Sequence, residues 1–204
     1  MSARRRAAIQ VAAVALGLVP LAWLVVRALA GDLGANPIEE VTHATGLAAL
    51  RLLLLALAVT PARRWLRLAS LAPLRRTFGL LAFGYACLHF LTYLVLDQFF
   101  DWSAIAEDVA KRPYAMAGFF AFLCLAPLAA TSTRAMARRL GRRWKTLHRL
   151  AYVAATAAVV HFVWLVKKDL REPLLYAAVL ALLFAARASR RKARAVLAAP
   201  EPAG

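Results

Sequence analysis

Residues 141–169 read GRRWKTLHRLAYVAATAAVVHFVWLVKKD, and this stretch decides the fold class of the chain. It opens with a run of basic residues and then stays apolar for about 20 residues, the length that a helix needs to cross a bilayer. Two histidines, His148 and His161, lie inside it. Ionisable side chains are costly in lipid and usually serve a function there. Both histidines are therefore candidates for ligands.

The composition of the whole chain also indicates a membrane protein. Of its 204 residues, 63% are hydrophobic, against about 45–50% in soluble domains, and the mean hydropathy is +0.63. The formal net charge of +17 could suit nucleic acid. The basic residues, however, gather in short clusters between long apolar runs, as in polytopic membrane proteins. We therefore expect membrane lipid around the chain and no nucleic-acid partner.

Six apolar windows predict an all-α, integral membrane, six-helix transmembrane bundle that forms a single domain. The windows are 8–29, 45–60, 78–96, 114–131, 147–166 and 173–186, followed by a basic cytoplasmic tail at 187–204. The first window follows three arginines, as a signal peptide would, but its apolar run is too long and Pro20 and Trp23 interrupt it. Arg51, inside the second window, is expected to face the bundle or to extend toward the interface.

The distribution of charge predicts the orientation of the bundle. Basic clusters lie at the N-terminus, between spans two and three, between spans four and five, and in the C-terminal tail. All acidic residues except Glu201 lie in the opposite loops. Because basic clusters favour the cytoplasmic side, both termini are expected to be cytoplasmic.

Two histidines are expected at matching depth on parallel helices. His89 lies about 12 residues into span three, or roughly 18 Å from its cytoplasmic edge, and His161 about 14 residues into span five, or roughly 21 Å. This is the arrangement that could hold a haem between spans three and five through two axial imidazoles. A mononuclear zinc or copper site would need further ligands. The chain has no CxxCH for covalent attachment, so a b-type haem fits better.

The inner half of the bundle offers a less regular set of candidates. His148 precedes His161 by 13 residues and could ligate a second haem, but on a straight helix the two rings would point about 140° apart. The helix would have to bend or tilt, or its first turn would have to loosen. At the matching inner depth of span three stand Arg75 and Arg76 rather than histidine. The alternative for His148 is a surface histidine in a basic loop.

His43, at the outer edge of span two, has three interpretations: an outer-face ligand, part of a quinone site, or a solvated residue at the start of a helix. The two cysteines, Cys87 and Cys124, both lie in apolar runs without CxxC spacing. That pattern excludes a disulfide framework and a sequence-evident iron–sulfur site. We expect both cysteines to be small core residues.

Several stretches of the chain resemble a known family of membrane haem proteins. They are LGRRWKTLHRLAYVAATAAVVHFVWLVK at 140–167, LRRTFGLLAFGYACLHFLTYLVLD at 74–97, KRPYAMAG at 111–118, TSTRAM at 131–136 and HATG at 43–46. In this order and spacing they are similar to the haem-binding membrane subunits of periplasmic protein-methionine-sulfoxide reductases, the MsrQ family. The wider group is the ferric-reductase-like transmembrane domain, in which paired histidines on two helices hold two stacked haems.

The resemblance implies a cofactor set and a set of partners. It implies haem b, one or two per chain, with His89, His161 and His148 as ligands of the haem iron and Arg75 or Arg76 at the fourth ligand position. It also implies FMN, at a site that the sequence does not locate. The chain would be an inner-membrane electron-transfer subunit without a complete catalytic site of its own. Electrons would come from the quinone pool or a cytosolic flavin reductase and reach a periplasmic molybdenum-dependent methionine sulfoxide reductase subunit, which repairs oxidised periplasmic proteins.

Other functions stay open beside this one. A ferric-reductase-like cytochrome b with another acceptor would use the same residues. A small transporter predicts charges in several spans and inverted repeats, whereas only Arg51 lies mid-span and no repeat is evident. In a membrane scaffold the histidines would only link helices. The chain has no GxGxxG fingerprint and no P-loop, so a nucleotide-dependent donor would have to be a separate protein.

Overall fold

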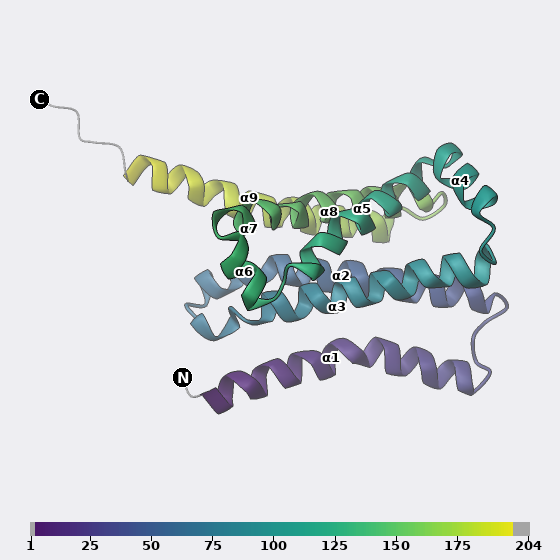
Figure 1. Cartoon of the computed structure of the whole chain (residues 1–204), viewed down its shortest axis with the longest axis horizontal. Helices are drawn as coiled ribbons and strands as arrows, with labels where there is room; N and C mark the ends of the chain where they lie inside the picture. Colours follow the sequence, from purple (N-terminus) through teal and green to yellow (C-terminus); the bar gives the residue numbers. More distant parts are fainter. Residues whose placement is uncertain (1–2, 198–204) are drawn as a thin grey trace, which may run out of the picture.

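The computed structural model describes residues 3–197, and the side chains of residues 4–189. Every regular element in that range is helical (Figure 1). In chain order the elements are α1 (Ala3–Leu29), α2 (Pro37–Trp65), η1 (Ala69–Leu71), α3 (Leu74–Leu91), the π-helical turn η2 (Thr92–Asp97), α4 (Trp102–Lys111), α5 (Pro113–Ala130), α6 (Arg134–Leu140), α7 (Arg142–Leu147), α8 (Leu150–Leu165) and α9 (Arg171–Leu197).

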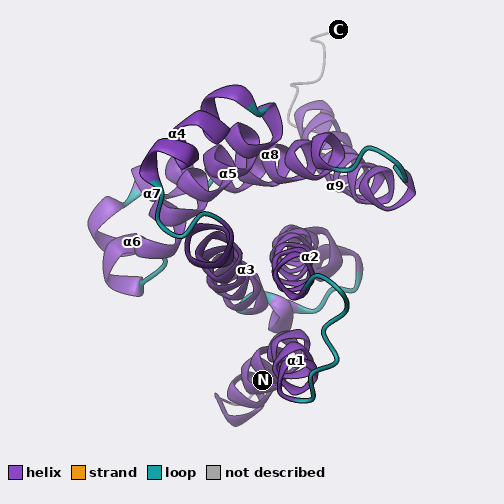
Figure 2. Cartoon of the chain, turned by 90° about the vertical axis from the view of Figure 1, so that its right-hand side faces the viewer, coloured by secondary structure: helices purple, strands orange, loops and turns teal. Residues whose placement is uncertain are grey.

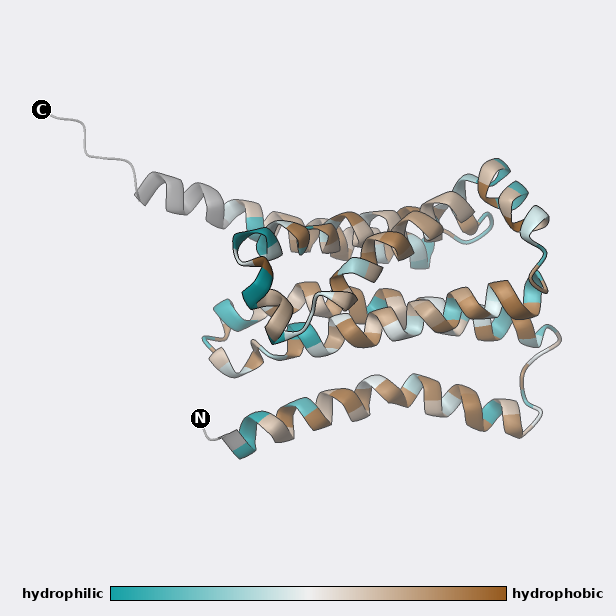
Figure 3. Ribbon diagram, viewed as in Figure 1, coloured by the Kyte–Doolittle hydropathy of each residue, from teal (hydrophilic) through white to brown (hydrophobic). Residues whose placement is uncertain are grey.

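Within residues 3–197, six helical segments are long and apolar enough to cross a membrane, which confirms the predicted fold class. They are α1, α2, α3 with η2, α5, α7 with α8, and α9. In Figure 3 the apolar residues run along these helices, while hydrophilic residues gather at their ends and in α6 and α7. The chain is thus an all-α multi-pass membrane protein.

Two of these helices, α2 and α9, extend furthest beyond the apolar windows that predicted them. Helix α2 begins at Pro37, with the side chain of Asn36 accepting a hydrogen bond from the Glu39 amide, and it continues to Trp65. Helix α9 continues to Leu197, eleven residues past the predicted end of the sixth span at Ala186. A helix can extend beyond the hydrocarbon region because its backbone hydrogen bonds do not depend on apolar side chains. The predicted tail is therefore helical as far as Leu197, and its residues 198–204 lie outside the described residues.

The spans are arranged around a central group of four. Viewed end-on in Figure 2, α2, α3, α5 and α8 form this group, α9 packs along α2 and α8, and α1 lies against α2 and α3 at the opposite edge. The buried apolar residues come mainly from α2, α8 and α5. The buried core therefore lies inside the four central helices.

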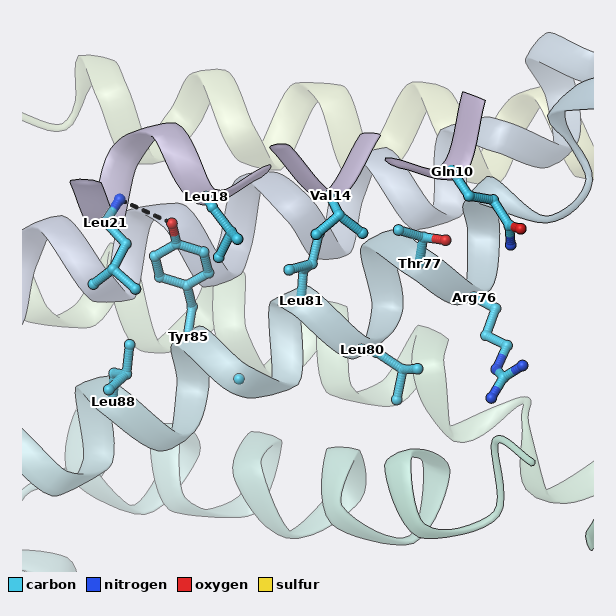
Figure 4. A pocket seen from close by; sticks show the side chains of 11 residues that line it. Gln10, Val14, Leu18, Leu21, Arg76, Thr77, Leu80, Leu81, Tyr85 and Leu88 are labelled. Atoms are coloured by element: carbon cyan, nitrogen blue, oxygen red, sulfur yellow. Dashed lines mark hydrogen bonds between the residues drawn. The ribbon is translucent and has the colours of Figure 1, made fainter. Parts of the chain in front are cut away.

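Helix α1 is attached to α3 by one hydroxyl group. The Tyr85 hydroxyl donates to the carbonyl oxygen of Gly17 (2.8 Å) and accepts from the amide of Leu21 (3.0 Å), next to Pro20 (Figure 4). These are the two backbone groups that would otherwise bond to each other in the helix. A side chain inserted into the helical ladder is a common cause of a bend, and here it also joins two helices.

The four central helices form two hairpins that repeat each other, which the sequence alone did not reveal. The carbonyl of Thr42 on α2 contacts His89 on α3, and the carbonyl of Tyr114 on α5 contacts His161 on α8, both across 47 residues. A shift of 72 residues, from 42 to 114 and from 89 to 161, therefore carries one contact onto the other. The α2–α3 and α5–α8 hairpins also run through the bundle in the same direction (Figure 1). No repeat is evident in the sequence because this one lies in contacts and hardly at all in residue identity.

Candidate functional site

The first histidine of the site is fixed by the neighbouring helix. The Nδ1 atom of His89, on α3, lies 2.8 Å from the backbone carbonyl oxygen of Thr42 on α2. Gly46, one turn further along α2, faces the same ring. A Cβ atom added at Gly46 would lie 3.0 Å from His89 Nδ1 and 3.1 Å from Cε1. The helices can come this close because position 46 has no side chain.

The second histidine has the same surroundings in the other hairpin. The Nδ1 atom of His161, on α8, lies 2.7 Å from the carbonyl oxygen of Tyr114 on α5. Gly118 faces this ring, and a Cβ atom there would lie 2.7 Å from Nδ1 and 2.9 Å from Cε1. The fit is tighter than at His89, and so tight that even alanine would force a shift.

These contacts determine which nitrogen of each ring is free. A carbonyl oxygen can only accept a hydrogen bond, so Nδ1 must carry the proton in both rings, and in the neutral imidazole Nε2 then keeps its lone pair. Within the described part of the chain, neither Nε2 atom has a hydrogen-bond partner. Metal-binding histidines are commonly oriented in this way, by a carbonyl or carboxylate on the nitrogen that does not bind the metal.

The two rings face each other across the bundle, as their predicted depths suggested. The ring centroids of His89 and His161 are 6.1 Å apart and the ring planes are inclined by 77°. A metal–imidazole bond is about 2.0–2.1 Å long, so two imidazoles on one iron have centroids roughly 6 Å apart. Among the described residues no group of three or more His, Cys, Asp or Glu side chains could hold a metal ion. The pair therefore suits a metal whose other ligands come from a macrocycle.

His148 is held differently, in a break between two helices. Helix α7 ends at Leu147 and α8 begins at Leu150, so His148 lies in a loosened turn instead of on a straight helix. The ring stacks on Trp144 with centroids 3.8 Å apart, and its Nδ1 lies 3.1 Å from the Trp144 carbonyl oxygen. Its Nε2 atom is buried and has no partner. This histidine therefore also keeps a free Nε2 lone pair.

His148 lines a cavity of about 1210 Å³ in the inner half of the bundle. The volume exceeds the roughly 300–1000 Å³ usual for small-molecule sites. The apolar part of the wall comes from the four central helices and α9, and none of the described residues that line the cavity is acidic. Its basic residues are Arg64, Arg75, Arg76, Lys145, Arg149 and Arg187. The cavity thus combines an apolar wall, a free imidazole nitrogen and a concentration of positive charge, which suits an anionic cofactor.

Arg75 and Arg76 both line this cavity, as their position in the sequence suggested. The 72-residue shift that relates the hairpins makes Arg76 the counterpart of His148 in the first hairpin. Arg76 also lines a second cavity of about 420 Å³ between α1 and α3, whose wall is mostly leucine and valine (Figure 4). The guanidinium of arginine stays protonated in proteins, so it binds carboxylates well and iron poorly.

One residue of this site was missed by the sequence analysis. Arg187, on α9, points its Nη2 atom at the carbonyl oxygen of Leu57 (2.6 Å), and its guanidinium lies over the ring of Tyr152, 4.7 Å from the centroid. The Nε and Nη1 atoms are buried without partners. In the sequence Arg187 was assigned to the basic tail, because it directly follows the sixth apolar window. The continuous helix α9 was the missing information.

His43 and Arg51 lie outside these two sites. His43 is exposed on α2, and its ring centroid is 6.1 Å from that of Phe162. Arg51 donates to the Tyr176 hydroxyl (2.6 Å) and pairs with Glu172 (3.2 Å), both on α9. It therefore faces a neighbouring helix, as expected for a charge in a span.

Comparison with known proteins agrees with this architecture. Residues 45–159 match the family model described as "Ferric reductase like transmembrane component". The chain is 53% identical over 171 residues to the "Protein-methionine-sulfoxide reductase heme-binding subunit MsrQ" of Rhodospirillum rubrum, which covers 83% of this chain and 82% of that protein. Proteins of the same name from Xanthomonas campestris pv. campestris and Caulobacter vibrioides are 49% identical over 185 residues and 48% identical over 161 residues. These alignments cover 89% and 78% of this chain, and 85% and 77% of the two relatives.

No solved structure matches the chain significantly. The similarity to the curated relatives extends over most of their length, and the matched ferric-reductase region contains all of α3 and α5 and most of α2 and α8. On these grounds the chain belongs to the MsrQ family of protein-methionine-sulfoxide reductase heme-binding subunits, within the ferric-reductase-like membrane proteins.

Proposed function

We propose that this protein carries electrons across the bacterial inner membrane to a periplasmic methionine sulfoxide reductase subunit, for the repair of oxidised periplasmic proteins. One observation carries the proposal. His89, His161 and His148 each present a neutral imidazole whose Nδ1 atom is bonded to a backbone carbonyl and whose Nε2 atom is free. These histidines lie at two depths of one bundle, so two electron carriers, one at each depth, would together bridge most of the thickness of the membrane.

At the outer level, His89 and His161 would bind the two faces of one haem b. The site fits such a group because its imidazoles have the right protonation and separation, and because Gly46 and Gly118 leave room for them. Haem iron, when bound, supplies reversible one-electron exchange between its ferric and ferrous states. The role of the chain is to hold both rings through Thr42 and Tyr114 and to exclude water from the site.

At the inner level, His148 would bind one axial face of a second haem, and no second imidazole is available. Arg75 and Arg76 would pair with its carboxylates, since a guanidinium grips a carboxylate through two parallel hydrogen bonds. The other axial face would be open or filled by an exogenous ligand. A haem with a single protein ligand is lost more easily than one with two. Purified protein should therefore contain between about one and two haems per chain.

We propose that both termini face the cytoplasm, which places the inner cavity on the donor side. The basic loops then lie in the cytoplasm, where basic clusters are favoured. Reporter fusions at Gly34 and Ala104 should be exported, and those at Ser70 and Arg138 should be cytoplasmic. A cytoplasmic signal at Ala104 would contradict the parallel direction of spans three and five.

The proposed partners follow from the family. The acceptor is a molybdenum-dependent periplasmic catalytic subunit, and the donor is either the quinone pool or a cytosolic flavin reductase. FMN is a further cofactor that we propose by resemblance, without a site. The relatives are named as heme-binding subunits of a reductase, so the chain itself would transfer electrons without acting on methionine sulfoxide.

Absorption spectroscopy and cofactor analysis test the proposal. Purified protein should show a Soret band and, when reduced, the split α and β bands of low-spin haem. Pyridine haemochrome and flavin analysis should give the number of each cofactor per chain. Membranes that contain the protein and its catalytic subunit should reduce methionine sulfoxide only when a donor is supplied. A colourless protein that folds normally would exclude electron transfer and favour a scaffold or a transporter.

A further inference from the structure

Arg187 is distinguished from the other basic residues of the inner cavity by guanidinium nitrogens that are buried without a hydrogen-bond partner. Arg64, Arg76, Lys145 and Arg149 line the same cavity but are exposed. Among the described side chains that line it, only Arg187 and His148 have buried nitrogen atoms without a hydrogen-bond partner. A solvated arginine needs no partner, whereas a buried guanidinium that lacks one is destabilising.

The guanidinium of Arg187 is also held in place. Its Nη2 atom bonds to the Leu57 carbonyl oxygen on α2, and its charge lies over the Tyr152 ring on α8. Helix α9 thus positions Arg187 between two central helices. These contacts use one of the three guanidinium nitrogens and leave Nε and Nη1 for another group. The nearby charges, from Arg64 and Arg75, repel it, and the cavity wall has no acidic residue to compensate among the side chains that the structure describes.

The unpartnered atoms of the cavity define the ligand that it would accept. The free Nε2 atom of His148 can bind a metal or accept a hydrogen bond. The unpaired Nε and Nη1 atoms of Arg187 can donate hydrogen bonds to an anion. The apolar wall between them suits a ligand with a flat or bulky hydrophobic part. An inorganic anion or a lipid headgroup would satisfy Arg187 alone. An iron porphyrin with carboxylate side chains satisfies all three requirements.

We propose that Arg187 holds a propionate carboxylate of the haem that His148 binds. The inference rests on the proposed function and deepens it. It assigns a carboxylate partner to the sixth span, where Nε and Nη1 are already oriented and desolvated, in addition to Arg75 and the exposed Arg76 of span three. A charge-assisted bond in a buried site is stronger than one at the surface, so Arg187 should contribute more to retention than Arg76.

The experiment compares two porphyrins on four forms of the full-length protein. The forms are wild type, Arg187→Leu, Arg187→Lys and the control Arg139→Leu, which changes an exposed arginine of α6 that does not line the cavity. Each is prepared under haem limitation and titrated with iron protoporphyrin IX and with its dimethyl ester, whose carboxylates are blocked. The quantity measured is the affinity of the haem that His148→Ala removes.

We expect wild type and Arg139→Leu to prefer the free acid strongly. Arg187→Leu should weaken binding of the free acid by at least about 30-fold and should lose the preference over the ester. Arg187→Lys should fall between them, because lysine keeps the charge without the planar donor array. In the porphyrin-free state Arg187→Leu should raise the unfolding temperature, because an unpaired buried charge is removed. A purely structural arginine would lower it.

The spectrum of the His89–His161 haem reports in every sample whether the bundle is folded. If Arg187→Leu retains the His148-dependent haem and still prefers the free acid, another cation holds the carboxylate and the inference is wrong. An equal loss of affinity for acid and ester would also overturn it, since Arg187 would then only support the fold. A flavin lost in place of haem would assign the residue to a phosphate. If His148→Ala removes no haem at all, the proposed inner site itself fails.

Discussion

The hairpins α2–α3 and α5–α8 are built alike in the outer half of the bundle and differently in the inner half. In the outer half each hairpin has a glycine, a backbone carbonyl one turn before that glycine, and a histidine whose ring contacts both the carbonyl and the glycine. In the inner half the second hairpin has His148 and the first has Arg76 in the corresponding register. The two hairpins thus have the same residue, histidine, at one level, and histidine in one hairpin against arginine in the other at the second level.

This difference indicates how one fold could hold two haems with different numbers of protein ligands. Two neutral imidazoles on one iron give a closed, six-coordinate site. An inner haem would be held by one imidazole, because the corresponding residue of the other hairpin is an arginine. Since arginine stays protonated, the second face of the iron would have no protein ligand. We therefore expect the outer site to be tight and spectroscopically uniform, and the inner site to be weaker and accessible to small ligands.

The largest expected effect is the loss of the outer haem. His89→Ala or His161→Ala should each remove the six-coordinate low-spin signal, because each leaves a single axial ligand. The measurement is the reduced-minus-oxidised spectrum together with EPR. His43→Ala is the matched control, since His43 also lies on a central helix but is exposed and has its ring contact with Phe162. Two single variants with wild-type spectra and haem content would disprove the assignment.

The second prediction restores the symmetry that the inner half lacks. Arg76→His places an imidazole in the first hairpin at the register of His148, so the inner haem should become six-coordinate and low-spin. His148→Ala should have the opposite effect, lowering haem content and leaving the outer spectrum largely intact. EPR-monitored redox titration distinguishes the two sites. If wild type already shows two identical bis-imidazole signals, the inequality between the levels does not exist.

The third prediction compares the two glycines. An alanine at Gly118 would bring Cβ to 2.7 Å from the ring of His161, whereas at Gly46 the nearest ring atom of His89 would be 3.0 Å away. Both changes should displace the ring and weaken its bond to the carbonyl, and loss of such an orienting contact typically costs about 10–100-fold in metal affinity. Gly118→Ala should be the more severe. Gly84→Ala, where a Cβ atom meets nothing within 4 Å and which does not line the inner cavity, is the control for the haem titration.

Sequence reasoning could place His89 and His161 at a common depth because depth is a one-dimensional quantity. The number of spans and the positions of His89 and His161 in parallel helices require only counting along the chain. The 6.1 Å approach of the two rings was consistent with that count. The orienting carbonyls of Thr42 and Tyr114 could not be predicted, because backbone groups carry no residue signature.

The inner site was less predictable because it depends on where helices begin and end. The angle of about 140° between the rings of His148 and His161 applies only to a straight helix, and α7 ends at Leu147, before His148. Arg187 can line the cavity because α9 continues beyond Ala186. Neither boundary is marked by a proline or a glycine at the position concerned. The repeat was missed for a related reason, since it preserves spacing between contacts and replaces most side chains.

The smallest expected effect concerns a feature that only the first hairpin has. Tyr85 joins α3 to α1 through its hydroxyl, and the residue 72 positions later is Ala157, which has no such group. Tyr85→Phe should lower the free energy of unfolding by about 0.5–1.5 kcal/mol, the usual net value of a hydrogen bond. The loss should lie near the lower end, because the Leu21 amide can then bond directly to the Gly17 carbonyl and restore the helical ladder.

Denaturant unfolding in detergent measures this change, and the haem spectrum should stay as in wild type because Tyr85 contacts neither site. Tyr152→Phe is the control: its hydroxyl has no hydrogen-bond partner among the described residues, so its removal should leave stability nearly unchanged. Equal effects of the two substitutions would show that the hydroxyl of Tyr85 does not hold α1. A larger effect of Tyr85→Phe that also broadens the haem signals would show that α1 supports the geometry of His89, four residues along α3. The first hairpin would then depend on a neighbour that the second hairpin lacks, and the two equivalent histidines would be held to unequal degrees.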